Sequence, residues 1–289
     1  MALLSRGARL SGDKISLVLG LPNSYYLPMH DLIDLERYPL DRLDSSDGKN
    51  LVAECIAALE REGMFTLKGF MRRAVIDAIL PGLIERLARE SFTHAREHNI
   101  YFDDGNADLP LDHPALARVN TVNHTLCGDQ IGTQLKQIYL WPALTHFLAQ
   151  VMQKPALYPM DDPLACANVM GYYAGEGLNW HFDRSEFTTT LLLQAPQRGG
   201  EFQFRHALRS AADPNYAGIA SLLRGEDPEI STLQLGAGDL NVFKGVNTAH
   251  RVTPPLGERA RVVTVFTFYE TPGRMFSDEE NLGFYGRTN

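Results

Sequence analysis

The stretch Asn179–Glu186, which reads NWHFDRSE, decides how the rest of this chain is interpreted. If it is extended, His181 and Asp183 occupy positions i and i+2 and point to the same face of one strand, as two ligands of one metal ion must. A third ligand has to come from elsewhere, and His250 is the candidate. Two imidazoles and one carboxylate form a facial triad that holds Fe(II) and leaves the opposite positions open for substrates and dioxygen. The pattern therefore predicts an oxygenase site rather than a structural metal site.

A His-x-Asp pattern alone occurs by chance in many proteins. The sequence around this motif supports its interpretation as a metal site. Gly199–Phe202, GGEF, follows one predicted strand, and Gly238–Leu240, GDL, precedes the distal histidine. An arginine, Arg261, comes soon after that histidine. Together these features favour a metal centre over a structural or surface role for the two histidines.

Arg261 begins the mostly apolar segment 262–269, VVTVFTFY. An unpaired buried guanidinium is costly, and its planar fork suits a carboxylate, so a dicarboxylate cosubstrate would supply the partner that this position needs. Arg259 has the same strand parity and is the competing assignment, and Arg251 is a weaker third. The sequence leaves the choice between Arg261 and Arg259 open.

From about Leu157 onward the chain has the pattern of an antiparallel β region. Short segments of period two, rich in Thr, Val, Phe and Tyr, are separated there by glycine. Strands are expected over Ala165–Tyr173, Phe187–Gln194, Gly200–Phe204, Ser231–Leu235, Asp239–Phe243 and Arg261–Glu270. The stretch Arg205–Asp227 is expected to be an insertion between strands, of the kind that often lines sites.

The first half of the chain is mainly helical in pattern. Apolar residues recur at helical spacing from Leu51 to a stop at Gly63, over Val75–Leu87 and over Pro142–Met152. The segment His98–Thr125 is polar and aromatic without clear periodicity, and we expect it to form a lid. Strands with helices upstream predict an α+β or mainly β fold, a β-sandwich or jelly roll buttressed on one side by helices.

No internal repeat or long linker divides the chain, so residues 1–289 are expected to form one domain. Residues 1–155 would give the helical support and lid, 156–272 the β core, and 273–289 a C-terminal extension. This extension contains the predicted short helix Phe276–Tyr285, which either closes the barrel or meets a second subunit in a homodimer.

Composition narrows the expected partners to a small-molecule substrate. The chain of 289 residues has a formal net charge of −8, so it offers no basic field for nucleic acid. Its apolar runs are shorter than the roughly 18 residues that span a membrane, and Met1–Arg6 does not begin a secretory signal peptide. Three cysteines without CxxC spacing predict neither a disulfide framework nor a zinc ribbon, so a cytoplasmic location is expected.

The motifs of this chain, taken together, resemble those of the Fe(II)/2-oxoglutarate-dependent oxygenases. They are, in order, Tyr172-x-x-Gly175, His181-x-Asp183, GGEF, GDL and the distal histidine and arginine. Within them it looks most like the prolyl-hydroxylase-type pattern, and the surrounding sequence is similar to the small enzymes that hydroxylate or halogenate free amino acids. The resemblance implies a double-stranded β-helix, which is a cupin-like jelly roll. It also implies that Fe(II) is the metal and that 2-oxoglutarate and O2 are cosubstrates.

Carried over to this chain, the resemblance makes His181, Asp183 and His250 the catalytic iron ligands. Arg261 would bind the distal carboxylate of 2-oxoglutarate, with Tyr172 as a hydrogen-bonding helper. In related halogenases a small residue replaces the aspartate and opens a position for chloride, so the intact Asp183 favours hydroxylation. The expected reaction is hydroxylation of an unactivated C–H of a small, free amino acid or derived metabolite, with succinate and CO2 as coproducts.

Other outcomes remain open at this point. The same chemistry can give desaturation or cyclisation of a natural-product intermediate, or act on a protein side chain. A catalytically silent β-barrel binding protein would be expected to lose at least one ligand. A zinc hydrolase is conceivable with two histidines and an aspartate, but it would leave Arg261 without a purpose.

Two further residues are candidates for contacts inside the barrel. Asn168 shares strand parity with Tyr172, so both are expected to face the interior beside 2-oxoglutarate; the alternative is a polar residue at a strand start. Trp180, next to His181, could wall the substrate site, although a buried aromatic of the β core is the commoner outcome.

Three arginines are candidates for binding a substrate anion. Arg184, directly after the metal-binding aspartate, would hold a carboxylate, or would pair with Glu186 or Glu201 as a structural ion pair. Arg72 and Arg73 would supply a second anion clamp, unless they belong to a solvated helix face.

Overall fold

The computed structural model describes residues 26–102 and 109–289. The N-terminal stretch Met1–Arg6 and residues 103–108 of the predicted lid lie outside the described residues. The α-helices are α2 (Met29–Leu32), α3 (Ser46–Glu62), α4 (Arg73–Glu90), α5 (Thr133–Tyr139), α6 (Pro142–Val151), α7 (Tyr216–Leu223) and α8 (Asp278–Tyr285), with short 3-10 turns at Leu40–Arg42 and Pro114–Leu116. Within the described residues, none of these helices has the length and apolar character to cross a membrane.

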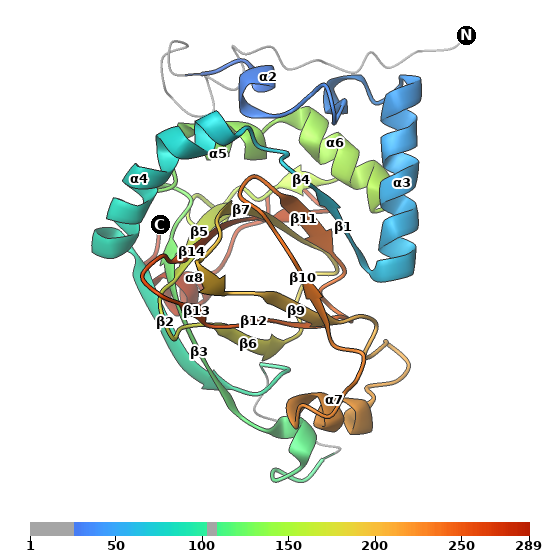
Figure 1. The fold of residues 1–289 in the computed structure, drawn as a ribbon, viewed down its shortest axis with the longest axis vertical. Coiled ribbons are helices and arrows are strands. Elements are labelled where there is room, and N and C mark those ends of the chain that lie inside the picture. Colours follow the sequence, from blue (N-terminus) through green and yellow to red (C-terminus); the bar gives the residue numbers. More distant parts are fainter. Residues whose placement is uncertain (1–25, 103–108) are drawn as a thin grey trace.

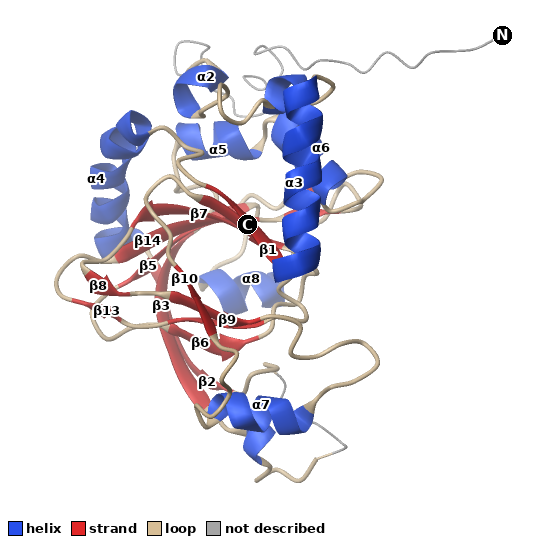
Figure 2. Ribbon diagram, turned by 45° about the vertical axis from the view of Figure 1, so that its right-hand side comes forward, coloured by secondary structure: helices blue, strands red, loops and turns tan. Residues whose placement is uncertain are grey.

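Two antiparallel sheets face each other and form the body of the protein (Figures 1 and 2). The larger has the order β1-β11-β7-β14-β5-β3-β2 and the smaller β10-β9-β12-β6. The larger sheet consists of β1 (Met64–Leu67), β2 (Phe92–His98), β3 (Val119–Leu126), β5 (Ala167–Tyr172), β7 (Thr188–Gln194), β11 (Leu240–Phe243) and β14 (Arg261–Phe266). The smaller sheet consists of β6 (Leu178–His181), β9 (Phe202–Arg205), β10 (Ser231–Leu233) and β12 (Ala249–Val252). There are also two short two-stranded ribbons: β8 (Arg198–Gly199) pairs with β13 (Pro255–Leu256), and β4 (Tyr158–Pro159) pairs with β15 (Phe268–Tyr269). This arrangement confirms the predicted jelly-roll core.

Helices α3, α4, α5 and α6 lie on the outer side of the larger sheet, as the sequence predicts (Figure 2). The period of two in each strand divides its side chains between the two faces. On β7, Leu191 and Leu193 join the main core beneath the helices, whereas Leu192 packs inward with Tyr172 and Val263. The inner face is therefore free to carry the polar side chains of a site.

The predicted helices are present with small shifts at their ends. Helix α3 begins after Ser45, whose side chain accepts a hydrogen bond from the Gly48 amide, and it ends at Gly63, which has a left-handed φ of 72°. A Cβ at Gly63 would overlap the His206 ring, so only glycine fits there. Pro81 lies inside α4, which continues through it.

The N-terminal part contributes strands that the sequence did not predict. The last part of the expected lid His98–Thr125, from Val119 onward, is β-structure: β3 pairs with β2 on one side and with β5 on the other. The reason lies in the inward-facing residues of these strands, which are polar and bond to one another. His98 contacts Thr121 Oγ1 at 2.7 Å, and Asn123 donates to Thr125 Oγ1 at 3.0 Å. Buried polar side chains hide the apolar alternation on which strand prediction depends.

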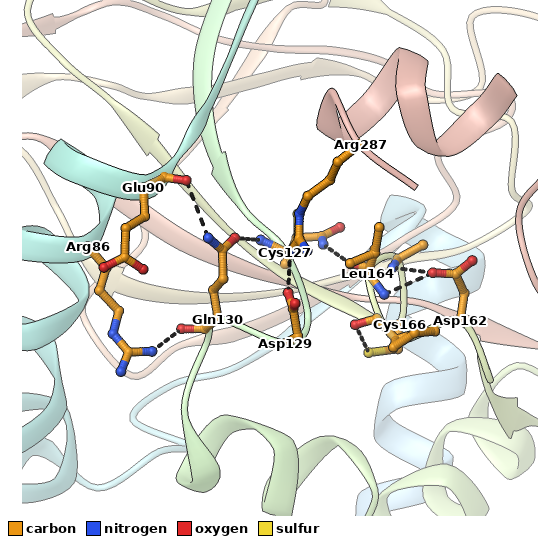
Figure 3. Close-up of polar contacts among 12 residues, drawn as sticks. Arg86, Glu90, Cys127, Asp129, Gln130, Asp162, Leu164, Cys166 and Arg287 are labelled. Carbon is orange, nitrogen blue, oxygen red and sulfur yellow. Dashed lines mark hydrogen bonds and ion pairs between the residues drawn. The ribbon is translucent and has the colours of Figure 1, made fainter. Parts of the chain in front are cut away.

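Polar contacts attach the C-terminal helix α8 and the residues after it to the rest of the protein, and Figure 3 shows Arg287 beside Asp129. Asp162 accepts hydrogen bonds from the backbone amides of Leu164 and Ala165 and from the side chain of Asn281 on α8. Beyond the helix, Arg287 forms an ion pair with Asp129 in the loop after β3. These contacts attach the predicted C-terminal helix to the segment before β5 and to the loop after β3.

Candidate metal centre

Three side chains from two neighbouring segments converge on the inner side of the smaller sheet. His181 is the last residue of β6 and Asp183 follows it by two positions, whereas His250 lies on β12 directly opposite His181 in the strand register. Asp183 Oδ1 is 3.4 Å from His181 Nε2 and 3.5 Å from His250 Nε2. Among the described residues this is the single group of three or more His, Cys, Asp or Glu side chains arranged to hold a metal ion.

The remaining polar atoms of these side chains are already engaged. His181 Nδ1 lies 2.8 Å from the Asn179 carbonyl, and His250 Nδ1 lies 2.9 Å from the Thr248 carbonyl. A carbonyl only accepts, so each Nδ1 carries the proton and each Nε2 offers its lone pair to the centre. Both histidines are 4 % exposed. Such outer contacts fix the tautomer and ring orientation that a metal ligand needs.

Asp183 is held in a pocket shaped for a carboxylate. Thr188 Oγ1 donates a short hydrogen bond to its Oδ2, which leaves Oδ1 facing the two histidines. Its backbone amide donates to the Gly245 carbonyl at 3.1 Å. A Cβ at Gly245 would lie 2.1 Å from Asp183 Oδ2, so glycine is required for the aspartate to fit.

The charges of the three groups support one another. Burial raises the pKa of Asp183, but the neighbouring histidines together lower it well below its usual range. For His250, burial lowers the pKa, and the Asp183 charge raises it above the ordinary value. For His181, burial and the charge of His250 lower the pKa. An ionised carboxylate with two imidazoles whose Nε2 atoms converge on it is a donor set that fits Fe(II).

A second feature of the site is a cavity of about 180 Å³ with Arg261 in its wall. Residues 199–202, the GGEF motif, form another part of its lining. Phe202, which belongs to this lining, has its ring 5.6 Å from that of His250. Phe202 therefore links the wall of the cavity to one of the metal ligands.

Arg261 is 4 % exposed and faces the inner side of the larger sheet. Within the described part of the chain its guanidinium has no hydrogen bond or ion pair; it lies over the Tyr172 ring, 5.7 Å from the centroid. Burial lowers the pKa of Arg261. Burial also raises the pKa of Tyr172 to about 12, and Arg261 and Asp183 act on that phenol in opposite directions. Tyr172 is thus close enough to both charged groups for each to act on its pKa.

The competing arginines point elsewhere. Arg259 is exposed and donates to the Pro196 carbonyl at 3.1 Å. Arg251 lies over the Trp180 ring, 4.7 Å from its centroid, on the outer face of β12. A buried arginine without an acidic partner is the one that an anionic ligand would neutralise, so the structure favours Arg261.

Asn168 does not lie beside the predicted cosubstrate site, and Trp180 is the buried core aromatic that the sequence analysis describes as the commoner outcome. Asn168 is four positions from Tyr172 along β5, or about 13 Å away; it accepts from Tyr285 Oη at 3.1 Å and donates to the Leu164 carbonyl at 2.8 Å. Trp180 has the opposite strand parity to His181, so it faces away from the metal centre and packs in a second core with α7. Neither residue contacts the metal ligands.

The predicted arginine clamp formed by Arg72 and Arg73 is also corrected by the structure. Arg72 donates to the His30 carbonyl at 2.6 Å, and Arg73 pairs with Asp77 at 2.7 Å. Arg72 directly precedes α4 and Arg73 is its first residue, and this helix lies on the outer side of the larger sheet. The intervening sheet separates them from the inner face that carries the site.

Arg184 turns toward α8 rather than toward the acids considered from the sequence. Its side chain is 72 % exposed, 3.9 Å from Glu280 and above the ring of Phe284. Arg96 on β2 is an arginine that the sequence analysis did not single out. Burial lowers its pKa most, and the charge of the nearby Arg184 lowers it further. The Arg96 guanidinium is 4.3 Å from the centroid of the Phe102 ring.

Phe102 and Thr188 are further site residues that sequence reasoning missed. Phe102 has an unusual positive φ of 54°, and its ring lies 5.5 Å from that of His181. For a bulky residue such a backbone conformation is costly and often marks a functional site. Neither residue belongs to a recognisable motif, because both reach the site only through the fold.

Comparisons with known proteins agree with this architecture. The family model described as Halogenase D matches residues 48–277. No curated protein matches the sequence. Among solved structures, the carbocyclase SnoK from nogalamycin biosynthesis is similar with a TM-score of 0.52 and 13% identity over 76% of this chain and 84% of that one.

Two other solved structures are similar to the same extent. The epimerase SnoN from nogalamycin biosynthesis has a TM-score of 0.51 and 15% identity, covering 76% of this chain and 83% of its own. HygX from Streptomyces hygroscopicus, with nickel and 2-oxoglutarate bound, has a TM-score of 0.50 and 14% identity, covering 77% and 87%. At these identities the likeness shows the fold.

Proposed function

The chain belongs to the Halogenase D family, and we propose that it is an Fe(II)- and 2-oxoglutarate-dependent dioxygenase that hydroxylates an unactivated C–H of a small substrate. The substrate class is a free amino acid or an amino-acid-derived metabolite. The observation that carries the proposal is the intact carboxylate of Asp183. Its pocket, formed by Thr188 and Gly245, is built to keep this group facing the two histidines.

The metal would be held by Nε2 of His181, Nε2 of His250 and Oδ1 of Asp183. When bound, Fe(II) with 2-oxoglutarate supplies activation of dioxygen and removal of a hydrogen atom from the substrate C–H, and releases succinate and CO2. The contribution of the protein is to fix the three donor atoms before any ligand arrives. The Asn179 and Thr248 carbonyls and the Thr188 hydroxyl do this by holding the opposite side of each ligand.

Arg261 would bind the distal carboxylate of 2-oxoglutarate. Its burial excludes competing water, which strengthens a charge-assisted hydrogen bond. Tyr172, which lies beneath the guanidinium and is 1 % exposed, limits the directions in which Arg261 can turn. Gly200 leaves room for this arginine, since a Cβ there would approach Arg261 Cδ to 3.4 Å.

Arg96 and Arg184 support a substrate that carries a carboxylate. The Arg96 guanidinium lies near the metal centre, because it stacks on Phe102, whose ring is next to that of His181. Arg184 directly follows Asp183 in the chain, and its side chain extends toward α8. In the described chain Arg96 has no acidic partner, and the contact of Arg184 with Glu280 is long. Like charges in proximity repel, so an anion placed between them would be favourable. The carboxylate of an amino acid meets this requirement.

An anaerobic titration of the metal-free protein with Fe(II) and 2-oxoglutarate tests the cofactor assignment. A visible charge-transfer band of the chelated 2-oxo acid is expected, and it should be lost in His181→Ala. Succinate release over a panel of free amino acids then identifies the substrate, and the product should gain one oxygen atom. A folded, metal-loaded protein that forms no band would overturn the proposal.

A further inference from the structure

Arg209, in the insertion that follows β9, lies against the residue between two of the metal ligands. Its Cζ is 3.8 Å from the centroid of the Phe182 ring. Phe182 has the opposite strand parity to His181, so its ring faces away from the metal centre and is 3 % exposed. The Tyr101 ring stacks on Phe182 at 6.0 Å, and Arg209 is 5.6 Å from Tyr101. The guanidinium thus closes an aromatic cluster behind the His-x-Asp segment.

The other side of Arg209 holds the loop between β11 and β12. Its Nε donates to the Val246 carbonyl at 2.9 Å. The residue before Val246 is Gly245. Its carbonyl accepts a hydrogen bond from the Asp183 amide, and the Asp183 side chain packs directly against it. Two residues after Val246, Thr248 offers the carbonyl that orients His250. One side chain therefore contacts both segments from which the metal ligands come.

Arg209 has no acidic partner among the residues that the structure describes. The groups facing it are the Phe182 and Tyr101 rings and backbone carbonyls. A half-buried guanidinium without an acid gains little stability from its charge, and an apolar side chain of similar length is often as good or better. We therefore attribute the structural role of Arg209 to the groups that it contacts and not to its charge.

We propose that Arg209 is a positioning residue of the metal centre, which fixes the His-x-Asp segment and the 245–248 loop relative to each other. The inference rests on the proposed function, because it concerns the same metal site. Without Arg209, Phe182 and the Val246 carbonyl are no longer joined. The three ligand atoms are then less well preorganised, and metal affinity should fall although the fold remains.

The test uses Co(II), a spectroscopic substitute for Fe(II), with the full chain under anaerobic conditions. Removing a residue that orients metal ligands typically lowers affinity roughly 10- to 100-fold, and this loss is expected for Arg209→Met. The visible Co(II) spectrum at saturation should also change. The metal-free protein should stay folded, and any fall in its thermal midpoint should be too small to account for the loss of affinity.

Arg274→Met is the matched control, since Arg274 also lies over an aromatic ring, 5.6 Å from that of Tyr269, but in a segment that carries no metal ligand. This variant should bind Co(II) as the unsubstituted protein does. Arg209→Lys keeps the charge without the planar group, so it should lose part of the affinity; it also serves if Arg209→Met does not fold.

Unchanged Co(II) affinity and spectrum in a folded Arg209 variant would overturn the proposal. So would a loss of affinity that only follows a lower stability of the metal-free protein, because this would show a general structural role. If the unsubstituted protein itself binds no Co(II), the proposed function fails, and the inference fails with it.

Discussion

His181 and His250 lie directly opposite each other on the antiparallel strands β6 and β12, with their ring centroids 4.1 Å apart. Two histidines that are distant in the sequence thus form one cross-strand pair, and Asp183 completes the group from the turn after β6. Because each Nδ1 is occupied by a carbonyl, the Nε2 atoms have no other orientation that keeps both hydrogen bonds.

Replacing either histidine by alanine should abolish metal-dependent turnover. Two protein ligands cannot hold the ion in the geometry that 2-oxoglutarate binding requires. The readouts are the charge-transfer band and succinate release. His146→Ala is the control, because His146 bonds only to Gln150 on the exposed side of α6. Retained activity in both ligand variants would refute the triad.

Arg261→Leu should raise the 2-oxoglutarate concentration needed for half-maximal activity by about 10- to 100-fold, since a hydrogen bond to a charged group contributes roughly 1.5–3 kcal/mol. Fe(II) affinity, measured by titration without 2-oxoglutarate, should change far less. Arg259→Leu should behave as the unsubstituted protein. The opposite ranking of the two variants would assign the carboxylate to Arg259.

Asp183→Gly should end hydroxylation, because it removes the anionic ligand. Supplying chloride would then place a halide donor where the carboxylate was, but chlorination also requires the substrate C–H to be suitably placed. We therefore expect the hydroxylated product to disappear, whereas a chlorinated product need not form. Mass spectrometry measures both products. Persistent hydroxylation in the glycine variant would show that another group replaces the aspartate.

Asn168→Ala should lower stability rather than cosubstrate affinity. The change leaves the buried Tyr285 hydroxyl without its acceptor, which costs about 1–3 kcal/mol. The Leu164 carbonyl keeps the hydrogen bond from the Gly128 amide. Urea unfolding measures this loss, and a 2-oxoglutarate titration provides the comparison. A raised 2-oxoglutarate requirement at unchanged stability would restore the role in cosubstrate binding that the sequence suggested.

Asp162 should make the anchoring of α8 sensitive to acid. Burial raises the pKa of Asp162, but hydrogen bonds from Asn281 and three backbone amides outweigh this, so the pKa is lowered in the folded state. The stabilisation is therefore complete above the unfolded pKa of about 3.9 and is lost as the pH falls through the folded pKa.

Unfolding experiments on Asp162→Asn across this pH range test the linkage. The variant should be less stable than the unsubstituted protein at neutral pH, and the difference should shrink as the pH falls below about 4. A difference that is constant with pH would mean that the Asp162 charge does not contribute.

The chemistry of the centre was readable from the sequence because its ligands belong to short local patterns. His181 and Asp183 are two positions apart, and the oxygenase superfamily, the jelly-roll fold and the enzyme class predicted from the motif are confirmed. The alternation of apolar residues predicted β5, β7 and β14, and helical spacing predicted α3, α4 and α6. Cytoplasmic location, the domain subdivision and a homodimer stay predictions.

Other properties depended on which segments the fold brings together. The sequence by itself pointed to His181, Asp183 and His250 as one metal-binding group and to Arg261 or Arg259 as the anion-binding arginine, since residue type and spacing carry this information. Only the tertiary structure decided that Asn168 supports α8, that Arg261 is buried whereas Arg259 is exposed, and that Thr188 and Arg209 hold the metal-ligand segments. These contacts depend on how turns, loops and strands are brought together in space, and no local periodicity records them.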